Sequence, residues 1–536
     1  MARIRLRTAH LHRVPHGLPL RDHEEFLLRI GSSRLSPPLV EVDHTRFLGH
    51  PHVLQGCRLC IYLDPSREWD PQRGFASALD RLYDWLRDAA AGKFDSESAL
   101  FHAVGGVLHQ TVGSPTVVVR DTGRPTKAQP AFLTQRSAHR NDLHYQTSGG
   151  DQHRTIVFDV ARPLPLGAGA RLRDLLVLLD TTPIPGILFM PRVDPQTPAF
   201  LVALAAAATR NPDGTSQTFV LRIPHPHGGP PHLLAGRITG AAADELRRLV
   251  KTRNDTLINI DPLSLDKTIP VEWCIVSDER SSVTTRRDTT RPTSAFQDKV
   301  VHVWGCGGLG SWIAEFIARA GAKRLVLCDP GTITGGLLVR QNFMEGDIGE
   351  SKAEALRQRI AAIRDDIQVE AHTGRIPADL IAMLPAVDVL IDATVSRAMG
   401  QLLDDLAPAD DRPLLAQVAT DAGTSTLGLL TVSARSHVAG PNALDQRTGP
   451  VVTARSDLES FHTFWRDVTA REELIPTRGC SIPTFHGSAA DVAAVAASLT
   501  SILGSHVASA EPISGTHLIG LPHSPAGPQH HFISAV

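Results

Sequence analysis

Residues Val300–Ser311 read Val-Val-His-Val-Trp-Gly-Cys-Gly-Gly-Leu-Gly-Ser. The first five residues, Val300–Trp304, have the pattern of a buried strand, and the glycines follow at once. An apolar helix is predicted over Trp312–Ala320, and a second strand over Arg324–Cys328 ends in Asp329. This is a Gly-x-Gly-x-x-Gly turn in the strand–turn–helix context that binds nucleotide phosphates.

The turn has the residues needed to hold a nucleotide. Glycine lets the backbone approach phosphate oxygens, and a helix N-terminus offers unpaired N–H groups to them. Asp329 lies 19 residues after the last glycine, a spacing suited to a ribose hydroxyl. Taken alone, the motif is most often that of a nicotinamide or flavin oxidoreductase. The predicted phosphate-binding glycines are Gly305, Gly307, Gly308 and Gly310.

Two cations downstream of the turn favour a different chemistry. Arg340 and Gln341 come 11 and 12 residues after Asp329, and Asp347–Gly349 leads to Lys352. A dinucleotide fold does not require these cations. An enzyme that cleaves ATP between the α and β phosphates does, because cations offset the charge as pyrophosphate leaves.

Together these residues resemble the ThiF-like adenylyltransferases, which include the ubiquitin-activating enzymes and the activators of bacterial sulfur carriers. The resemblance covers roughly residues 275–505. It implies a Rossmann-like, mainly parallel sheet, ATP and magnesium as cofactors, adenylation of a protein's C-terminal carboxylate, and a homodimer. It also implies that Arg286 or Arg287 reaches across the dimer to the neighbour's ATP. The alternative for both arginines is a solvated position in a polar linker.

The sequence departs from that family at three positions. Gly331 and Val395 stand where the family has aspartate, and Leu337 stands where it usually has asparagine. Asp392, in the predicted strand Val389–Thr394, is close to Val395 and is the candidate ligand for magnesium. The competing hypothesis is an inactive domain of the same fold that is retained for dimerisation.

Cys480 is the candidate for a first thioester. It lies in Thr477–Gly487, among small and hydroxyl residues before a helix predicted over Ala489–Leu503, which suits an accessible thiolate. The stretch resembles the crossover-loop cysteine of activating enzymes, and a buried structural cysteine is the alternative. The C-terminal region lacks the two Cys-x-x-Cys pairs that hold zinc in sulfur-carrier adenylyltransferases, so no zinc site is predicted.

A second cysteine, Cys60, lies in a segment of a different kind. It comes eight residues after His52, and Trp69-Asp70-Pro71 follows before a helix predicted over Gly74–Ala91. This order resembles the active-site segment of ubiquitin-conjugating enzymes, in which an asparagine at the position of His52 supports the oxyanion. An imidazole N–H can donate in the same way. The alternatives for Cys57 and Cys60 are half a zinc knuckle or a redox pair.

The remaining cysteines are predicted to be unreactive. Cys274 and Cys328 lie in apolar strand runs and are expected to be core residues. Cys306 lies inside the turn, where it is expected to fit as a small side chain. His225 and His227 form a His-x-His, but the segment after them has no serine suited to a tag-removing metalloprotease, and a loop is predicted there.

The sequence predicts an α/β protein of three domains: a conjugating-enzyme-like α+β domain at 1–100, a middle α/β domain at 101–275 and an adenylation domain at 276–536. Residues 105–153 are expected to be irregular, because they mix Gly, Pro, Thr, His and Arg without apolar periodicity. In the middle domain the predicted strands are Thr155–Val160 and Gln217–Ile223, and the predicted helices are Pro198–Ala207 and Ala241–Val250.

The composition limits the classes of partner and the cellular location that we expect for the protein. Lys plus Arg is 54 and Asp plus Glu is 56, so the net charge of −2 argues against a dedicated nucleic-acid binder. No uncharged apolar run of 18 residues is present, so no membrane span is predicted. Six cysteines in 536 residues argue against a disulfide framework and favour a cytoplasmic protein with reduced thiols.

The two resemblances are consecutive steps of one pathway. Their fusion resembles the bacterial activating–conjugating proteins of anti-phage defence operons, which implies the C-terminus of a nucleotide cyclase or a ubiquitin-like protein as partner. The acyl group would pass from the adenylate to Cys480, then to Cys60, and then to an amine of a target. The alternatives are a sulfur-carrier adenylyltransferase and a catalytically inactive dimeric scaffold.

Overall fold

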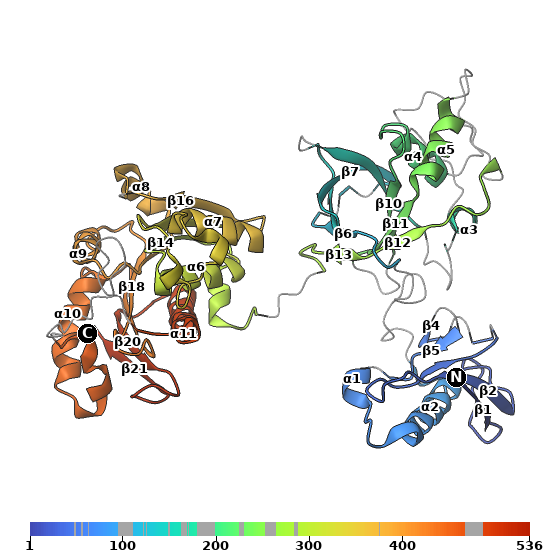
Figure 1. Ribbon diagram of the computed structural model, residues 1–536, viewed down its shortest axis with the longest axis horizontal. Coiled ribbons are helices and arrows are strands. Elements are labelled where there is room, and N and C mark those ends of the chain that lie inside the picture. Colours follow the sequence, from blue (N-terminus) through green and yellow to red (C-terminus); the bar gives the residue numbers. More distant parts are fainter. Residues whose placement is uncertain are drawn as a thin grey trace. The chain divides into compact units, whose positions relative to one another are not determined.

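The chain divides into two compact units, Met1–Thr285 and Arg286–Val536, and each is described by itself (Figure 1). Among the residues that the structure describes, the first unit contains two sheets and the second contains one. The computed structural model describes residues 1–44, 46–47, 50–54, 57–62, 64–94, 111–121, 123–124, 126–147, 151–161, 169, 171–179, 199–224, 230–251, 264–283, 288–374, 376–466 and 486–535.

An antiparallel sheet and one long helix form the N-terminal part of the first unit. The strand order is β1-β2-β3-β5-β4. The apolar stripe of α2 buries Leu82, Trp85 and Leu86 against Phe26 and Leu28 of the sheet, and each side chain of this size contributes roughly 1.5–3 kcal/mol. This is the predicted α+β arrangement. The elements are β1 (Ala2–Arg7), β2 (His23–Arg29), β3 (Leu39–Glu41), β4 (Val53–Leu54), β5 (Arg58–Leu59), α1 (Pro65–Glu68) and α2 (Gly74–Ala90).

The middle sheet closes on itself. Its strand order is β12-β11-β10-β9-β7-β8-β6-β13. Only Ile275 separates β12 from β13, so one stretch of chain pairs with β11 at its start and with β6 at its end. The result is a barrel. Its strands are β6 (Thr116–Val119), β7 (Ala128–Ser137), β8 (Arg140–His144), β9 (Gln152–Asp159), β10 (Gln217–Ile223), β11 (His232–Ile238), β12 (Glu272–Cys274) and β13 (Val276–Asp278).

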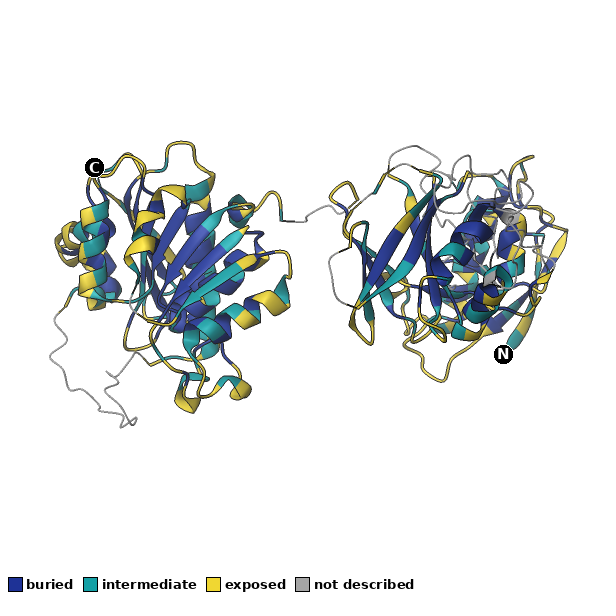
Figure 2. Cartoon of the chain, turned by 90° about the horizontal axis from the view of Figure 1, so that it is seen from above, coloured by how far each residue is buried: buried dark blue, intermediate teal, exposed yellow. Residues whose placement is uncertain are grey.

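The barrel has two apolar faces, because side chains alternate along each strand. The inner face gathers Leu133, Val157, Val220 and Ala235 into one core. The outer face packs against α3 (Leu172–Leu178), α4 (Ala199–Ala208) and α5 (Gly240–Lys251), whose side chains share a second core with β9 and β10. Figure 2 shows buried strands in this barrel and in the sheet of the second unit. The two strands and two helices predicted for the middle domain are confirmed.

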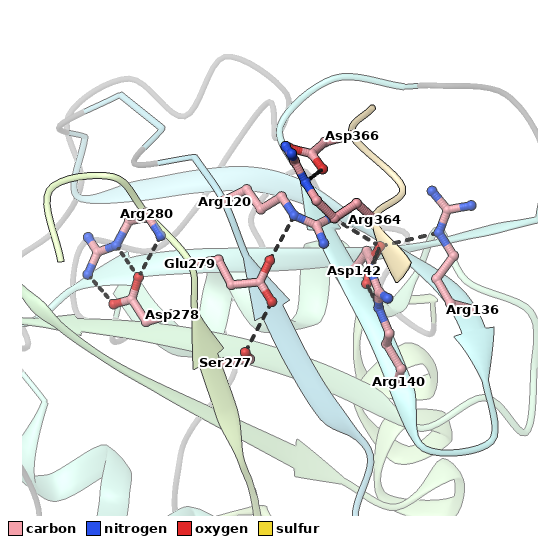
Figure 3. A network of polar contacts seen from close by, with 10 residues as sticks. All are labelled: Arg120, Arg136, Arg140, Asp142, Ser277, Asp278, Glu279, Arg280, Arg364 and Asp366. Carbon is pink, nitrogen blue, oxygen red and sulfur yellow. Dashed lines mark hydrogen bonds and ion pairs between the residues drawn. The ribbon is translucent and has the colours of Figure 1, made fainter. Parts of the chain in front are cut away.

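The prediction that residues 105–153 are irregular is wrong for the part of that segment that the structure describes. Strands β6, β7 and β8 lie there, and β9 begins there. The pattern is hidden because Arg136 and Arg140 project from the β7–β8 hairpin onto the buried carboxylate of Asp142 (Figure 3). A register shift between Gln135 and Ser137 breaks the alternation further.

The second unit has a Rossmann-like α/β fold, as predicted. Its strand order is β16-β15-β14-β17-β18-β19-β20-β21. The strands from β16 to β18 pair in parallel, and the strands from β18 to β21 pair antiparallel. The bounds are β14 (Val300–Trp304), β15 (Arg324–Cys328), β16 (Gln368–His372), β17 (Val389–Asp392), β18 (Leu414–Thr420), β19 (Leu427–Ser433), β20 (Gly515–Gly520) and β21 (Gln529–Ser534).

Helices cover both faces of this sheet. One core is shared by α6 (Gly308–Arg319), α7 (Lys352–Ile363) and α11 (Ala489–Ala508), and another by α8 (Ala378–Ala382) and α9 (Arg397–Leu406). By length and composition α11 alone among the described helices is apolar enough to cross a membrane, yet Val492, Val495 and Leu499 are buried in the core. The other elements are α10 (Pro441–Thr453) and the 3-10 turns η4 (Pro292–Phe296), η5 (Gly335–Leu337), η6 (Glu345–Asp347), η7 (Leu384–Ala386) and η8 (Ser456–Phe464).

Candidate functional site

The glycine turn joins β14 to α6 and depends on glycine at two positions. Gly305 has φ +89°, and a Cβ there would lie 2.7 Å from the backbone of Ala393. A Cβ at Gly310 would lie 1.8 Å from the carbonyl oxygen of Gly305. A Cβ at Gly307 would have no atom within 4 Å. The protein's own backbone therefore requires glycine at 305 and 310, whereas Gly307 faces open space that a ligand atom can occupy.

The strand-end carboxylate of Asp329 is part of the turn. Its Oδ2 accepts a hydrogen bond from the backbone N–H of Cys306 at 2.7 Å, and its Oδ1 accepts from Gly331 at 2.7 Å. The backbone N–H of Lys352 donates to the carbonyl of Gly331 at 2.9 Å. A Cβ at Gly331 would lie 2.9 Å from Asp329 Oδ1 and 3.3 Å from Lys352 Nζ. The missing side chain at Gly331 thus leaves room for Lys352 beside Asp329.

The Arg340-Gln341 segment packs on the first turns of α6. Trp312 Nε1 donates to the carbonyl of Arg340 at 3.3 Å, and the backbone N–H of Asn342 donates to Ser311 Oγ at 3.1 Å. Arg340 is partly buried, and burial lowers the pKa of its guanidinium. Gln341 is buried, and its Oε1 has no hydrogen-bond partner. The structure therefore brings both predicted residues to the helix that follows the glycine turn.

Sequence reasoning missed a buried anchor behind this segment, Glu315 of α6. Its carboxylate accepts from Asn342 Nδ2 at 2.6 Å, from Arg359 Nε at 2.8 Å and from Arg319 Nε at 2.9 Å. Burial acts to raise the pKa of Glu315, but these hydrogen bonds outweigh it and hold the pKa below its usual value. The signal was a single carboxylate in an otherwise apolar helix, which requires partners when it is buried.

Asp392 ends β17, and its side chain is fully buried. Thr394 donates to Oδ1 from its backbone at 2.9 Å and from its hydroxyl at 2.6 Å, and Gln417 Nε2 donates to Oδ2 at 3.2 Å. Burial raises the pKa of Asp392 despite these hydrogen bonds. Val395 is 77% exposed and has φ +55°, a backbone conformation that is costly for a β-branched residue. The loop that carries it lies against Gly305.

No group of three or more His, Cys, Asp or Glu side chains is arranged to hold a metal ion in the described parts of the chain.

Cys60 and His52 come together in the first unit. The backbone N–H of Cys60 donates to the carbonyl of His52 at 2.8 Å, and the His52 ring meets Phe94 edge-on with centroids 4.9 Å apart. Cys60 is half-buried, and its Sγ donates to the carbonyl of Tyr62 at 3.3 Å. Burial raises the pKa of the Cys60 thiol, and Glu68 raises it further, whereas Arg58 and Arg81 lower it.

Cys57 is half-buried like Cys60, whereas the three cysteines that were predicted to be unreactive differ from both. Cys274, Cys306 and Cys328 are all buried. Burial raises the pKa of Cys274 to about 11 and that of Cys328 to about 12, and it also raises the pKa of Cys306 well above its ordinary value. These three thiols are protonated at neutral pH and are poor nucleophiles.

Several residues singled out from the sequence lie outside the described residues. They are Cys480, Arg286, Arg287, His225 and His227.

Residues 291–463 match the model of the ThiF family. Residues 150–279 match the model of the Cap2 central linker domain, and residues 8–105 match that of prokaryotic E2 family A. The glycine turn, Asp329, Arg340, Lys352 and Asp392 all fall within the ThiF match, and Cys60 and His52 fall within the E2 match. This order agrees with the fusion of a conjugating-like and an activating-like domain that the sequence resembles.

Curated relatives align with part of this chain. The sulfur carrier protein ThiS adenylyltransferase of Escherichia coli (strain K12) is 32% identical over 128 residues, which is 24% of this chain and 51% of that protein. The ubiquitin-like modifier-activating enzyme 5 of Caenorhabditis briggsae is 33% identical over 91 residues, which is 17% of this chain and 21% of that protein. The chain thus spans between about a fifth and a half of these relatives' lengths.

Among solved structures, that of Escherichia coli MccB with ATP aligns at 15% identity and a TM-score of 0.31. The alignment covers 46% of this chain and 66% of that one.

Proposed function

We propose that this protein uses ATP to adenylate the C-terminal carboxylate of a partner protein and then transfers the acyl group through two cysteines to an amine. The observation that carries the proposal is the joining of the glycine turn, Asp329 and Lys352 around Gly331, in a segment similar to the ThiF family. The first step is supported most directly, because several matched relatives are named as adenylyltransferases.

The residues at the turn fit a nucleotide. The N-terminus of α6 offers N–H groups for phosphate oxygens, and the open space at Gly307 leaves room for them. Asp329 uses both carboxylate oxygens to hold the loop, and each keeps lone-pair capacity for a ribose hydroxyl. Arg340 and Lys352 are the cations that would offset charge as pyrophosphate leaves. When bound, magnesium would supply further positive charge at the phosphates, with Asp392 as our candidate ligand.

In each transfer step one bond to the acyl carbon forms and one bond to it breaks. The Cys480 thiolate attacks the acyl-adenylate and AMP leaves, so that a thioester keeps the carboxyl group activated. The Cys60 thiolate then attacks that carbonyl carbon, and the Cys480 thiolate leaves. An amine of the target attacks the second thioester, loses a proton and displaces the Cys60 thiolate. The His52 imidazole would donate a hydrogen bond to the oxyanion that forms in this last step.

The partner is proposed to be the C-terminus of a nucleotide cyclase or of a ubiquitin-like protein, and the target a protein or small-molecule amine, in an antiviral defence pathway. The adenylating domain is proposed to act as a homodimer, with Arg286 or Arg287 reaching the neighbour's ATP. We place this chemistry in the cytoplasm, where ATP and reduced thiols are available, with no nucleic acid or membrane involved.

Two assays separate this function from its alternatives. Exchange of labelled pyrophosphate into ATP is expected from either adenylating enzyme and not from an inactive scaffold. A reductant-sensitive protein adduct on Cys60 is expected from the conjugating enzyme and not from a sulfur-carrier activator. With ATP, magnesium and the partner, Cys60→Ala should hold the adduct on Cys480. Cys480→Ala should retain pyrophosphate exchange and form no adduct, and an adduct on its Cys60 would refute the two-cysteine order.

A further inference from the structure

The barrel of the first unit has a polar cavity at one end. Its volume is about 140 Å³, and it lies where β9 and β10 begin and where β7 and β11 end. Each of these strands contributes a polar side chain to its lining. They are Gln135 of β7, His153 of β9, Thr218 of β10 and Arg237 of β11, and the other polar residues of the lining are Asn141 of β8, Arg154 of β9, Thr215 and Ser216.

The lining continues the inner face of the barrel. Gln135, Thr218 and Arg237 each lie two residues along a strand from a residue of the inner apolar core, so they point to the same side. At this end of the barrel the apolar core therefore gives way to hydroxyl, amide, imidazole and guanidinium groups. None of the described residues that line the cavity is Asp or Glu. The wall is consequently rich in donors and contains no anion.

One of these groups has an unmet hydrogen-bonding capacity. His153 Nδ1 is buried and has no hydrogen-bond partner in the protein. Buried polar atoms without partners are uncommon, and each requires an explanation such as a bound group. Because solvent does not reach this nitrogen, it offers no open contact to a ligand in the cavity, and the open donors of the wall come from the other polar residues.

Arg237 is held in place by a carboxylate outside the lining. Its Nε and Nη2 donate to Glu272 Oε2 at 2.9 and 2.7 Å, and the two residues are directly opposite on β11 and β12. A guanidinium has five N–H donors in a fixed plane. Glu272 accepts hydrogen bonds from two nitrogens of Arg237 and so fixes the plane of the guanidinium. The Arg237–Glu272 pair presents an oriented donor edge to the cavity and carries no net charge.

The hairpin that forms one wall is fixed from its outer side. Arg136 Nε donates to Asp142 Oδ2 at 3.2 Å, and Arg140 Nε donates to Asp142 Oδ1 at 2.6 Å (Figure 3). Gln135 and Asn141 are the neighbours of these residues and face the cavity. The arginine cluster therefore holds the wall without being part of it.

We propose that this cavity binds a small oxyanion, a carboxylate or a phosphate. The donor-rich wall, with Arg154 and the oriented Arg237 in it, favours acceptor oxygens with negative charge. The volume suits such a group and is well below the roughly 300–1,000 Å³ of sites for drug-sized molecules. The assignment is independent of the adenylation chemistry, because every residue in it lies in the barrel.

The test is deuterium exchange of the full-length chain during titration with inorganic phosphate, read out by mass spectrometry. Phosphate is expected to slow exchange in residues 133–141 and 215–218, a readout that is separate from any phosphate bound at the glycine turn. A second arm uses a short peptide with a free C-terminal carboxylate and the same peptide with a C-terminal amide. Protection by the free acid and not by the amide identifies a carboxylate as the ligand, and protection by phosphate alone identifies a phosphate.

Three variants make the test decisive. His153→Phe keeps a ring and removes both nitrogens, and the pair Arg237→Gln/Glu272→Gln removes a cation together with its partner. Each should weaken binding by about tenfold or more, as loss of a charge-assisted hydrogen bond does. Arg136→Gln, on the outer side of the same hairpin, should leave the affinity unchanged. The proposal is overturned if none of the anions protects these residues, or if the cavity variants bind as tightly as the wild type. Thermal melts confirm that each variant folds, and Thr218→Val replaces a variant that fails to fold.

Discussion

The glycine turn of the second unit and a loop of the first unit both contain residues with positive φ. We call the second the Cys60 loop, and it contains His52, Cys57 and Cys60. The two segments stabilise this backbone conformation by different means. The turn places Gly305 at φ +89°, which costs a glycine little. The Cys60 loop places His52 at φ +61° and Cys57 at φ +58°, where a side chain costs about 1–2 kcal/mol. The Cys60 loop therefore depends on its surroundings, namely the hydrogen bond from Cys60 to His52 and the packing of His52 on Phe94.

The largest effect is expected from a substitution inside the glycine turn. Gly310→Ala places a Cβ 1.8 Å from the carbonyl oxygen of Gly305, so the turn cannot form without moving the backbone. We expect loss of pyrophosphate exchange and destabilisation by about 3 kcal/mol or more, at or above the usual range for overpacking. The measurements are exchange of labelled pyrophosphate and chemical denaturation.

The matched control for that change is Gly307→Ala, because its Cβ would meet no atom within 4 Å. It should fold with wild-type stability and still lose roughly tenfold or more in exchange, since the methyl group occupies space assigned to phosphate oxygens. Wild-type exchange in Gly307→Ala would show that no phosphate approaches there.

The next effect concerns the cations near the turn. Lys352→Ala and Arg340→Ala should each lower pyrophosphate exchange by about 10²–10³, the typical cost of removing one positioned charge-stabilising group. Stability should change little in Lys352→Ala, whose side chain is half-buried beside Gly331.

Lys323→Ala is the matched control, because that lysine follows α6 and lies outside the predicted site. If Lys352→Ala and Lys323→Ala exchange pyrophosphate equally well, the role assigned to Lys352 is wrong.

Local features of the chain could be predicted from the sequence more readily than features that depend on distant contacts. The turn, α6 and β15 follow from local pattern, because glycine spacing and apolar runs determine them within 30 residues. The barrel strands β6, β7 and β8 were missed, since Arg136 and Arg140 obscure the alternation in the β7–β8 hairpin and a register shift between Gln135 and Ser137 interrupts it. The Glu315 anchor was also missed, because its partners Asn342 and Arg359 come from two other segments. His52 and Val395 adopt a left-handed backbone conformation that histidine and valine normally avoid. The sequence therefore gave no indication of it at these two positions.

A smaller effect is expected at His52. His52→Ala removes the proposed oxyanion donor and should slow discharge of the Cys60 adduct to lysine by about 10²-fold, at the low end of such losses. His52→Asn should retain most of the rate, because asparagine tolerates the left-handed conformation and offers an amide N–H. Single-turnover discharge followed on non-reducing gels measures both. Equal rates for the alanine variant and the wild type would reduce His52 to a structural residue.

The smallest effect tests whether the surroundings of Cys60 set its reactivity. Glu68 raises the pKa of the Cys60 thiol, so Glu68→Gln should lower that pKa and enlarge the thiolate fraction at neutral pH. The gain should be roughly two- to fivefold, because interactions between exposed charges are worth under about 1 kcal/mol. Alkylation by iodoacetamide, followed at Cys60 by peptide mass spectrometry from pH 7 to pH 9, measures it. The rate should rise with pH in both proteins, because the folded-state pKa lies above the ordinary thiol value.

Cys328 is the internal standard in the same digest, since burial raises its pKa to about 12 and it should stay unmodified throughout. An unchanged profile in Glu68→Gln would mean that Glu68 does not raise the pKa of the Cys60 thiol, which leaves burial as the cause that raises it.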